Sequence, residues 1–76
     1  MKKIEANWKS YNQTQKGIFN YLFLVQQGTV DELAGYTSIN QNTVRTYLNG
    51  FIDDGILVRN SKKQRDKDAP YSFRKD

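Results

Sequence analysis

The stretch from Val30 to Leu48 constrains the fold most, because it predicts two helices joined by a tight turn. Thr29, directly before this stretch, and Glu32 within it have the spacing of a capping box, in which each side chain accepts a backbone hydrogen bond. A helix is therefore expected from Val30 to about Tyr36. Residues 37–39 are expected to form the turn, with the apolar side chain of Ile39 packed between the two helices. Asn40 is a favourable N-cap for the next helix, residues 41 to about 54.

The second of these helices has an apolar and a polar face. Its apolar residues recur at the spacing of a core stripe: Val44, Leu48, Phe51 and Ile52. At about 100° per residue, the opposite face holds Asn42, Thr46 and Asn49, with Arg45 and Thr43 on its flanks and Asp53 at the far end. Amides, hydroxyls and guanidinium groups pair with base edges and phosphates. Two helices joined by a tight turn place the second in the DNA major groove in many DNA-binding proteins.

A further helix is expected upstream, from Thr14 to Gln27, with Gly28 as a left-handed C-terminal cap. Its apolar face is broad and consists of Ile18, Phe19, Tyr21, Leu22, Phe23 and Val25. The first eleven residues fit a short helix or an extended arm, because Ile4, Trp8 and Tyr11 lie at i, i+4 and i+7. Trp8 is expected to anchor either the core or a dimer.

Two antiparallel strands are expected after the helices, at Ile56–Asn60 and Pro70–Lys75. Alternation predicts that Ile56 and Val58 point inward on the first strand, and Tyr71 and Phe73 on the second. Residues 61–68 are too polar to fold back on a core, so they predict a solvent-projecting loop. The chain thus reads as one α+β domain over residues 1–76, with a three-helix core at 14–54 and a β-hairpin at 56–75.

The net charge of +4 arises in this hairpin and the residues after it. Residues 1–58 carry five basic and five acidic side chains, whereas residues 59–76 carry seven basic and three acidic ones. A basic patch on a near-neutral body indicates contact with a polyanion, and a solvated loop is the alternative. The side chains expected to touch phosphate or the minor groove are Arg59, Lys62, Lys63, Arg65 and Lys67.

The composition argues against several other classes of function. The chain has no cysteine and no histidine, which argues against disulfides, thiol catalysis and zinc sites. No catalytic residues, no cofactor and no metal are expected, because there is no Gly-rich phosphate loop and no inward pair of carboxylates. The sequence shows neither a secretory signal nor an apolar run of membrane-spanning length. A cytoplasmic, nucleoid-associated protein without membrane contact is expected.

Over about residues 14–75 the chain resembles the winged helix-turn-helix family of transcription regulators. The resemblance lies in Asp31-Glu-Leu-Ala34, Thr37-Ser-Ile-Asn40, Thr43-Val-Arg-Thr-Tyr-Leu48 and Asp54-Gly-Ile-Leu57. It implies that Gln41, Asn42, Arg45 and Thr46 face DNA. Two positions depart from the family pattern: Ser38 stands where glycine is frequent, and Gly35 replaces an ordinary helix former at a cost of about 1 kcal/mol. The size is also similar to that of small regulators encoded by archaeal plasmids and viruses.

The favoured hypothesis is a sequence-specific regulator that binds double-stranded DNA and acts as a repressor. Its recognition helix would present Gln41, Asn42, Thr43, Arg45, Thr46 and Asn49, and the basic wing would hold the backbone or minor groove. The alternative to a DNA contact by Arg45 is an ion pair with Asp31 or Glu32 of the neighbouring helix. A winged helix that binds another protein is the rival function, and a binder of left-handed duplexes is a minor one. Two oligomeric states are left open: a homodimer through residues 4–11 or the last strand, and a monomer that pairs only on DNA.

Overall fold

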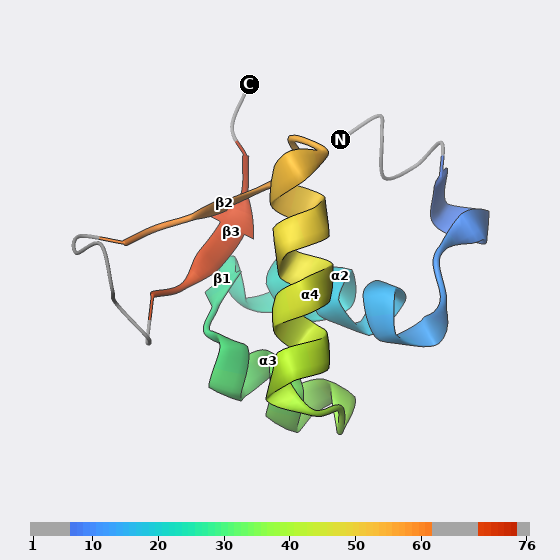
Figure 1. The fold of residues 1–76 in the computed structure, drawn as a ribbon, viewed down its shortest axis with the longest axis horizontal. Coiled ribbons are helices and arrows are strands. Elements are labelled where there is room, and N and C mark those ends of the chain that lie inside the picture. The colour runs from blue at the N-terminus through green and yellow to red at the C-terminus, as the bar shows by residue number, and fades with distance from the viewer. Residues whose placement is uncertain (1–6, 62–68, 75–76) are drawn as a thin grey trace.

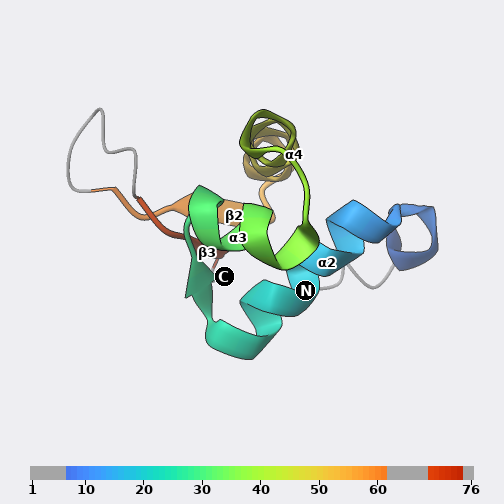
Figure 2. The ribbon, with the colours of Figure 1, turned by 90° about the horizontal axis from the view of Figure 1, so that it is seen from below.

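The computed structural model describes residues 7–61 and 69–74. A short 3-10 helix, η1 (Trp8–Ser10), precedes three α-helices: α2 (Gln13–Val25), α3 (Val30–Thr37) and α4 (Gln41–Asp53). Three short strands form one antiparallel sheet: β1 (Gln27–Gly28), β2 (Leu57–Arg59) and β3 (Tyr71–Phe73). The sheet lies to one side of α4 (Figure 1), and α3 lies between α4 and α2 (Figure 2). This arrangement is the predicted winged-helix fold.

Local capping explains where α2 and α3 begin. At α3, the Glu32 amide donates to Thr29 Oγ1 at 3.2 Å, and the Thr29 amide donates to Glu32 Oε1 at 3.0 Å, which confirms the predicted capping box. A second capping box starts α2: the Gln15 amide donates to Asn12 Oδ1 at 2.8 Å, and the Asn12 amide donates to Gln15 Oε1 at 2.9 Å. Helix α2 therefore begins at residue 13, one residue before the predicted start.

The predicted end of α2 is wrong. The helix stops at Val25, and Gln26 rather than Gly28 takes the positive φ, at 75°. Gly28 lies in β1 instead, where a Cβ would come within 2.8 Å of Tyr21 Cε2. This glycine is needed for the close approach of the strand to α2, and not for a left-handed cap.

Strand β3 is the centre of the sheet, because the strand order is β1-β3-β2. Gln27 pairs with Ser72 and Gly28 with Tyr71 on one side of it, and Leu57 pairs with Phe73 on the other. The two-residue strand β1 was not predicted from the sequence. Its pairing ties the wing strands directly to the segment between α2 and α3.

The predicted phase of β2 is also wrong, because Leu57 rather than Val58 is the inward residue. Leu57 is 1% exposed and Val58 is only partly buried. The cause is the turn at the end of α4, where Gly55 has a φ of 76° and the Ile56 amide donates to the Phe51 carbonyl at 2.9 Å. Ile56 is buried in that turn, before the strand begins. On β3 the prediction is confirmed, since Tyr71 is buried and Phe73 packs against the core.

The core lies between the three helices and the sheet. Its fully buried side chains come from every α-helix and from β2: Ile18, Phe19, Leu22, Leu33, Val44, Leu48 and Leu57. Phe19 is central, with its ring centroid 4.5 Å from that of Phe51 and 5.0 Å from that of Tyr11. Trp8 also packs on Phe19, with centroids 6.3 Å apart, as expected of a core anchor.

The end of α2 departs from the broad buried face that its sequence predicts. Phe23 is 44% exposed and Val25 41%, although Phe23 stacks on Phe73 with centroids 4.6 Å apart. Leu24, which was not part of the predicted face, is 75% exposed. Within the described part of the chain, no helix is long and apolar enough to cross a membrane.

Candidate nucleic-acid interface

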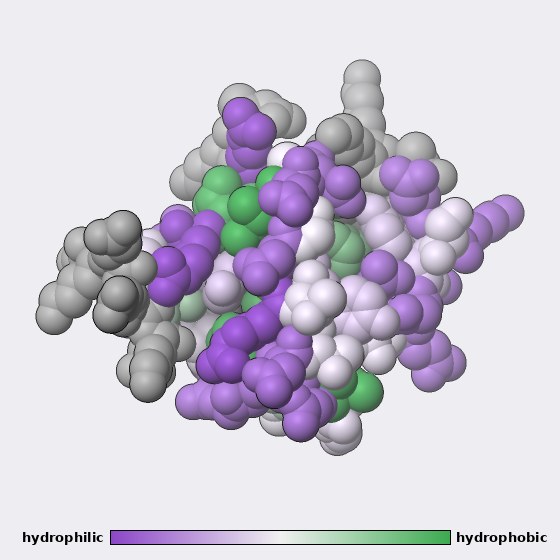
Figure 3. Space-filling model, viewed as in Figure 1, coloured by the Kyte–Doolittle hydropathy of each residue, from purple (hydrophilic) through white to green (hydrophobic). Residues whose placement is uncertain are grey.

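Helix α4 divides its residues between the core and the solvent as its periodicity predicts. Val44, Leu48 and Phe51 are buried, and Ile52 is partly buried against them. All six predicted recognition residues are exposed: Gln41, Asn42, Thr43, Arg45, Thr46 and Asn49. Figure 3 shows a continuous hydrophilic band along α4, which stands out on one face of the molecule (Figure 2). The fold thus gathers these six side chains on one accessible ridge.

The turn before α4 fixes the angle at which this ridge is presented. Ser38 adopts the left-handed conformation, with φ 58° and ψ 36°, at the position where the family pattern favours glycine. The Ile39 amide then donates to the Ala34 carbonyl at 3.2 Å. The Asn40 side chain accepts from the Asn42 amide at 2.8 Å, which confirms the predicted N-cap.

The first turns of α4 carry a chain of side-chain hydrogen bonds. Gln41 Nε2 donates to Asp31 Oδ1, across the turn from α3. Arg45 Nη1 donates to Asn42 Oδ1 at 3.2 Å, and Thr46 Oγ1 donates to the Asn42 carbonyl at 3.0 Å. The contact between Asp31 and Gln41 was not predicted, because the sequence suggested Asp31 only as an alternative ion-pair partner of Arg45.

The expected alternative for Arg45, an ion pair with an acidic residue of α3, is not what the geometry shows. Arg45 bonds to Asn42, whereas Asp31 accepts from Gln41. Glu32 is bonded to Thr29 and accepts from the Tyr21 hydroxyl at 3.2 Å. The two carboxylates are therefore engaged with other groups.

The bonds to Glu32 also shift the ionisation of the groups at the start of α3. Hydrogen bonds from the backbone and side chain of Thr29, together with the Tyr21 hydroxyl, lower the pKa of Glu32. Desolvation raises the pKa of Tyr21, and the neighbouring Glu32 charge raises it further. Glu32 is thus held in its charged form, where it caps α3 and braces α2 against it.

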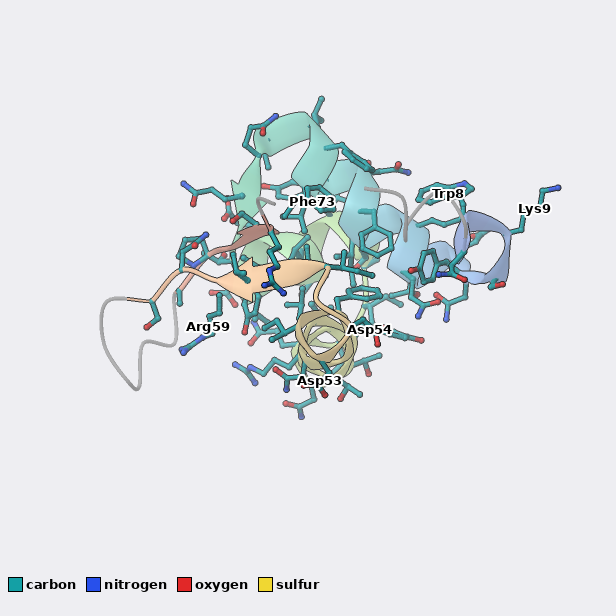
Figure 4. The ribbon with its side chains drawn as sticks, turned by 90° about the horizontal axis from the view of Figure 1, so that it is seen from above. Trp8, Lys9, Asp53, Asp54, Arg59 and Phe73 are labelled. Atoms are coloured by element: carbon teal, nitrogen blue, oxygen red, sulfur yellow. The ribbon has the colours of Figure 1, made fainter. Side chains whose placement is uncertain are left out.

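The flanks of α4 differ in charge and in packing. Arg59 at the end of β2 is exposed and points to the same side of the sheet as α4 (Figure 4), whereas Asp53 and Asp54 lie at the far end of the helix. The other predicted wing contacts, Lys62, Lys63, Arg65 and Lys67, lie outside the described residues.

On the opposite flank of α4, Asn12 Nδ2 donates to the Tyr47 hydroxyl at 2.9 Å, a link between α2 and α4 that was not predicted.

The remaining tyrosines and the apolar surface lie away from this ridge. The Tyr36 ring packs against Tyr21 in a tilted arrangement, with centroids 5.0 Å apart, and Tyr71 is buried, so both belong to the packing of the fold. An open groove of about 820 Å³ lies beside the sheet, lined by Val25, Gln26, Gln27, Val58, Asn60, Ser72, Phe73 and Arg74. In residues 7–61 and 69–74, no three acidic side chains gather as metal ligands would.

Comparison with known proteins identifies a similar solved structure. The chain is similar to a MarR family transcriptional regulator from Silicibacter pomeroyi DSS, with a TM-score of 0.73 and 15% sequence identity. The match covers 96% of this chain and 47% of that regulator, so the chain spans about half of its length. Neither a protein-family model nor a curated protein sequence matches the chain. At this identity the match establishes the winged-helix fold, and it gives no support to the weaker resemblance to archaeal plasmid and virus regulators.

Proposed function

We propose that the protein is a sequence-specific regulator of transcription that binds double-stranded DNA and acts as a repressor. The observation that carries this proposal is the solvent face of α4. From Gln41 to Asn49 this face presents amides, hydroxyls and one guanidinium group, with no carboxylate among them. These groups are the ones that read base edges and grip phosphates.

The shape of the molecule supports insertion of α4 into the major groove. The groove is about 12 Å wide and admits an α-helix. Helix α4 is a ridge that no other described element covers on its outer side (Figure 2). Asp53, at its far end, would be repelled by phosphates, so the first two or three turns are the part that enters. Those turns contain Asn42, Arg45 and Thr46.

The hairpin would hold the neighbouring backbone. Arg59 points to the α4 side of the sheet, and residues 62, 63, 65 and 67 are basic. Each phosphate that a lysine or arginine neutralises releases counterions, so wing contacts would strengthen binding to every sequence and make it sensitive to salt. The wing would then supply affinity while α4 supplies discrimination. Helix-turn-helix proteins commonly use two copies on two half-sites, and a homodimer on DNA stays a prediction here.

Repression requires no activity beyond DNA binding. A protein seated in the major groove over a promoter blocks access of other proteins to the same DNA. The similar solved structure is that of a transcriptional regulator, which agrees with this proposal. Autoregulation is the simplest case to examine first, with the DNA upstream of the protein's own gene as the candidate site.

The test is a competition titration at two salt concentrations, with upstream duplex against random duplex of equal length. We expect Arg45→Ala to weaken binding to the preferred duplex by about 1–3 kcal/mol and to reduce discrimination at one base pair. Lys9→Ala is the matched control, because it removes one exposed positive charge from η1, away from α4 (Figure 4). If Arg45→Ala changed neither affinity nor preference, α4 would not be the reading helix.

The rival function, a protein-interaction module, has one observation in its favour. Phe23, Leu24 and Val25 leave an apolar surface at the end of α2, beside the groove that includes Val58 and Phe73. On that reading the protein would show only weak DNA binding without sequence preference. The same titration separates the two functions.

A further inference from the structure

Two amide side chains at the start of α4 are each bonded to a group with only one hydrogen-bonding character. Gln41 is bonded to the Asp31 carboxylate, which only accepts, and Asn42 is bonded to the Arg45 guanidinium, which only donates. An amide carries an acceptor oxygen and a donor nitrogen, so the partner decides which of the two atoms each amide turns toward it. Gln41 must offer its nitrogen to Asp31, and Asn42 must offer its oxygen to Arg45.

The groups left for a ligand follow from this arrangement. Gln41 presents its oxygen, an acceptor, toward solvent. Asn42 presents its NH2 group, and Arg45 keeps its other N–H donors. All three side chains are exposed on adjacent turns of α4. The ridge therefore offers one acceptor at its beginning and a set of donors directly after it.

This pattern matches particular base edges in the major groove. Adenine presents an amino donor and one acceptor there and cytosine an amino donor, whereas guanine presents two acceptors and thymine one. An acceptor such as the Gln41 oxygen bonds an amino group and faces the guanine or thymine oxygen unfavourably. The donors of Asn42 and Arg45 suit the acceptors of guanine.

We propose that Asp31 is a positioning residue for specificity: by holding the Gln41 amide in one orientation, it selects an amino-bearing base, adenine or cytosine, next to the bases read by Asn42 and Arg45. This inference rests on the proposed function. Asp31 itself makes no contact with DNA in this scheme. Without it the Gln41 amide turns freely and bonds either class of base, so the discrimination at that one position is lost.

The decisive variant is Asp31→Asn, which keeps the size of the side chain but accepts or donates. Asp53→Asn is the matched control, because it removes one exposed carboxylate from the other end of α4. Gln41→Ala removes the reading group itself. Thermal unfolding of each variant establishes that it is folded, and binding is then measured with the preferred duplex, selected from a randomised pool, and with every single base-pair change in it.

For the unmodified protein we expect at least about fivefold discrimination between amino and keto bases at the position read by Gln41. Asp31→Asn should reduce it to less than about twofold there and leave the other positions unchanged, whereas Asp53→Asn should change none. Gln41→Ala should erase the same preference, and adding Asp31→Asn to it should have no further effect on base preference. A uniform gain in affinity for all sequences, with every base preference unchanged, would reflect only the lost negative charge and would contradict the positioning role.

Two results would overturn the inference in distinguishable ways. If a preferred duplex exists and Asp31→Asn leaves every base preference intact, the positioning role is wrong and the proposed function stands. If the protein prefers no duplex over random DNA, the proposed function fails and this inference fails with it.

Discussion

Replacing Gly35 with alanine should stabilise the protein. Gly35 is exposed within α3, and a Cβ added there would meet no atom within 4 Å. The new methyl group therefore brings neither a clash nor new packing. What remains is the helix propensity of the backbone, because glycine loses more conformational freedom on folding than alanine does.

The size of the effect follows from the position of the residue in the helix. In a helix interior, glycine is about 0.8–1.0 kcal/mol less favourable than alanine. Gly35 lies in the last turn of an eight-residue helix, so about 0.5–1 kcal/mol is expected. In a domain of 60–100 residues, a change of 1 kcal/mol shifts the melting temperature by about 4–8 °C. Gly35→Ala should therefore raise it by about 2–8 °C.

The assay is reversible unfolding by heat and by urea, followed by circular dichroism. Gly28→Ala is the contrasting variant and should lose about 1–3 kcal/mol. Its Cβ would lie 2.8 Å from Tyr21 Cε2, and the Tyr21 ring is held by its bond to Glu32. A destabilised Gly35→Ala protein would refute the reasoning, since it would mean that residue 35 is not in an ordinary exposed helical site.

Two further variants test the packing and the electrostatics of the fold. Because its folded pKa is lowered, Glu32 should add stability that is present above pH 4.5 and lost as the pH falls through the folded pKa. In urea titrations at pH 3–7, the free energy of unfolding should therefore fall less toward acid pH in Glu32→Gln than in the unmodified protein. Phe19→Ala should cost about 3–5 kcal/mol, a large part of the total stability of a small domain, and a loss below about 1 kcal/mol would contradict the central place of Phe19.

The helices were predictable because their signals are local. Capping residues at Thr29 and Asn40 and the apolar spacing of α4 act over a few residues, and both caps are confirmed. Strand β1 was not predictable in this way. Two residues are too few to show alternation, and Gln27–Gly28 is a strand only because β3 pairs with it from the far end of the described chain.

The candidate site likewise has features that the local sequence predicts and features that depend on how the helices pack. Which residues of α4 face solvent follows from helical periodicity, so the set from Gln41 to Asn49 could be named in advance. The bond from Gln41 to Asp31 depends on how the turn at Ser38 aligns two helices. Left-handed geometry at a serine is not specified by the serine itself, so this contact needed the structure. Likewise, the exposure of Val25 depends on where α2 stops.

The central place of β3 in the sheet has a consequence for the order in which the chain folds. The contacts within α2, α3 and α4 are local, but β1 and β2 have no common partner until β3 pairs between them. Contacts between residues far apart in the sequence form late, because the loop between them must close first. Until then the edges of β1 and β2 are unpaired, and such edges attract other chains. Completion of the sheet is therefore expected to be a late step, and a partly folded chain in which β3 is detached should be prone to association.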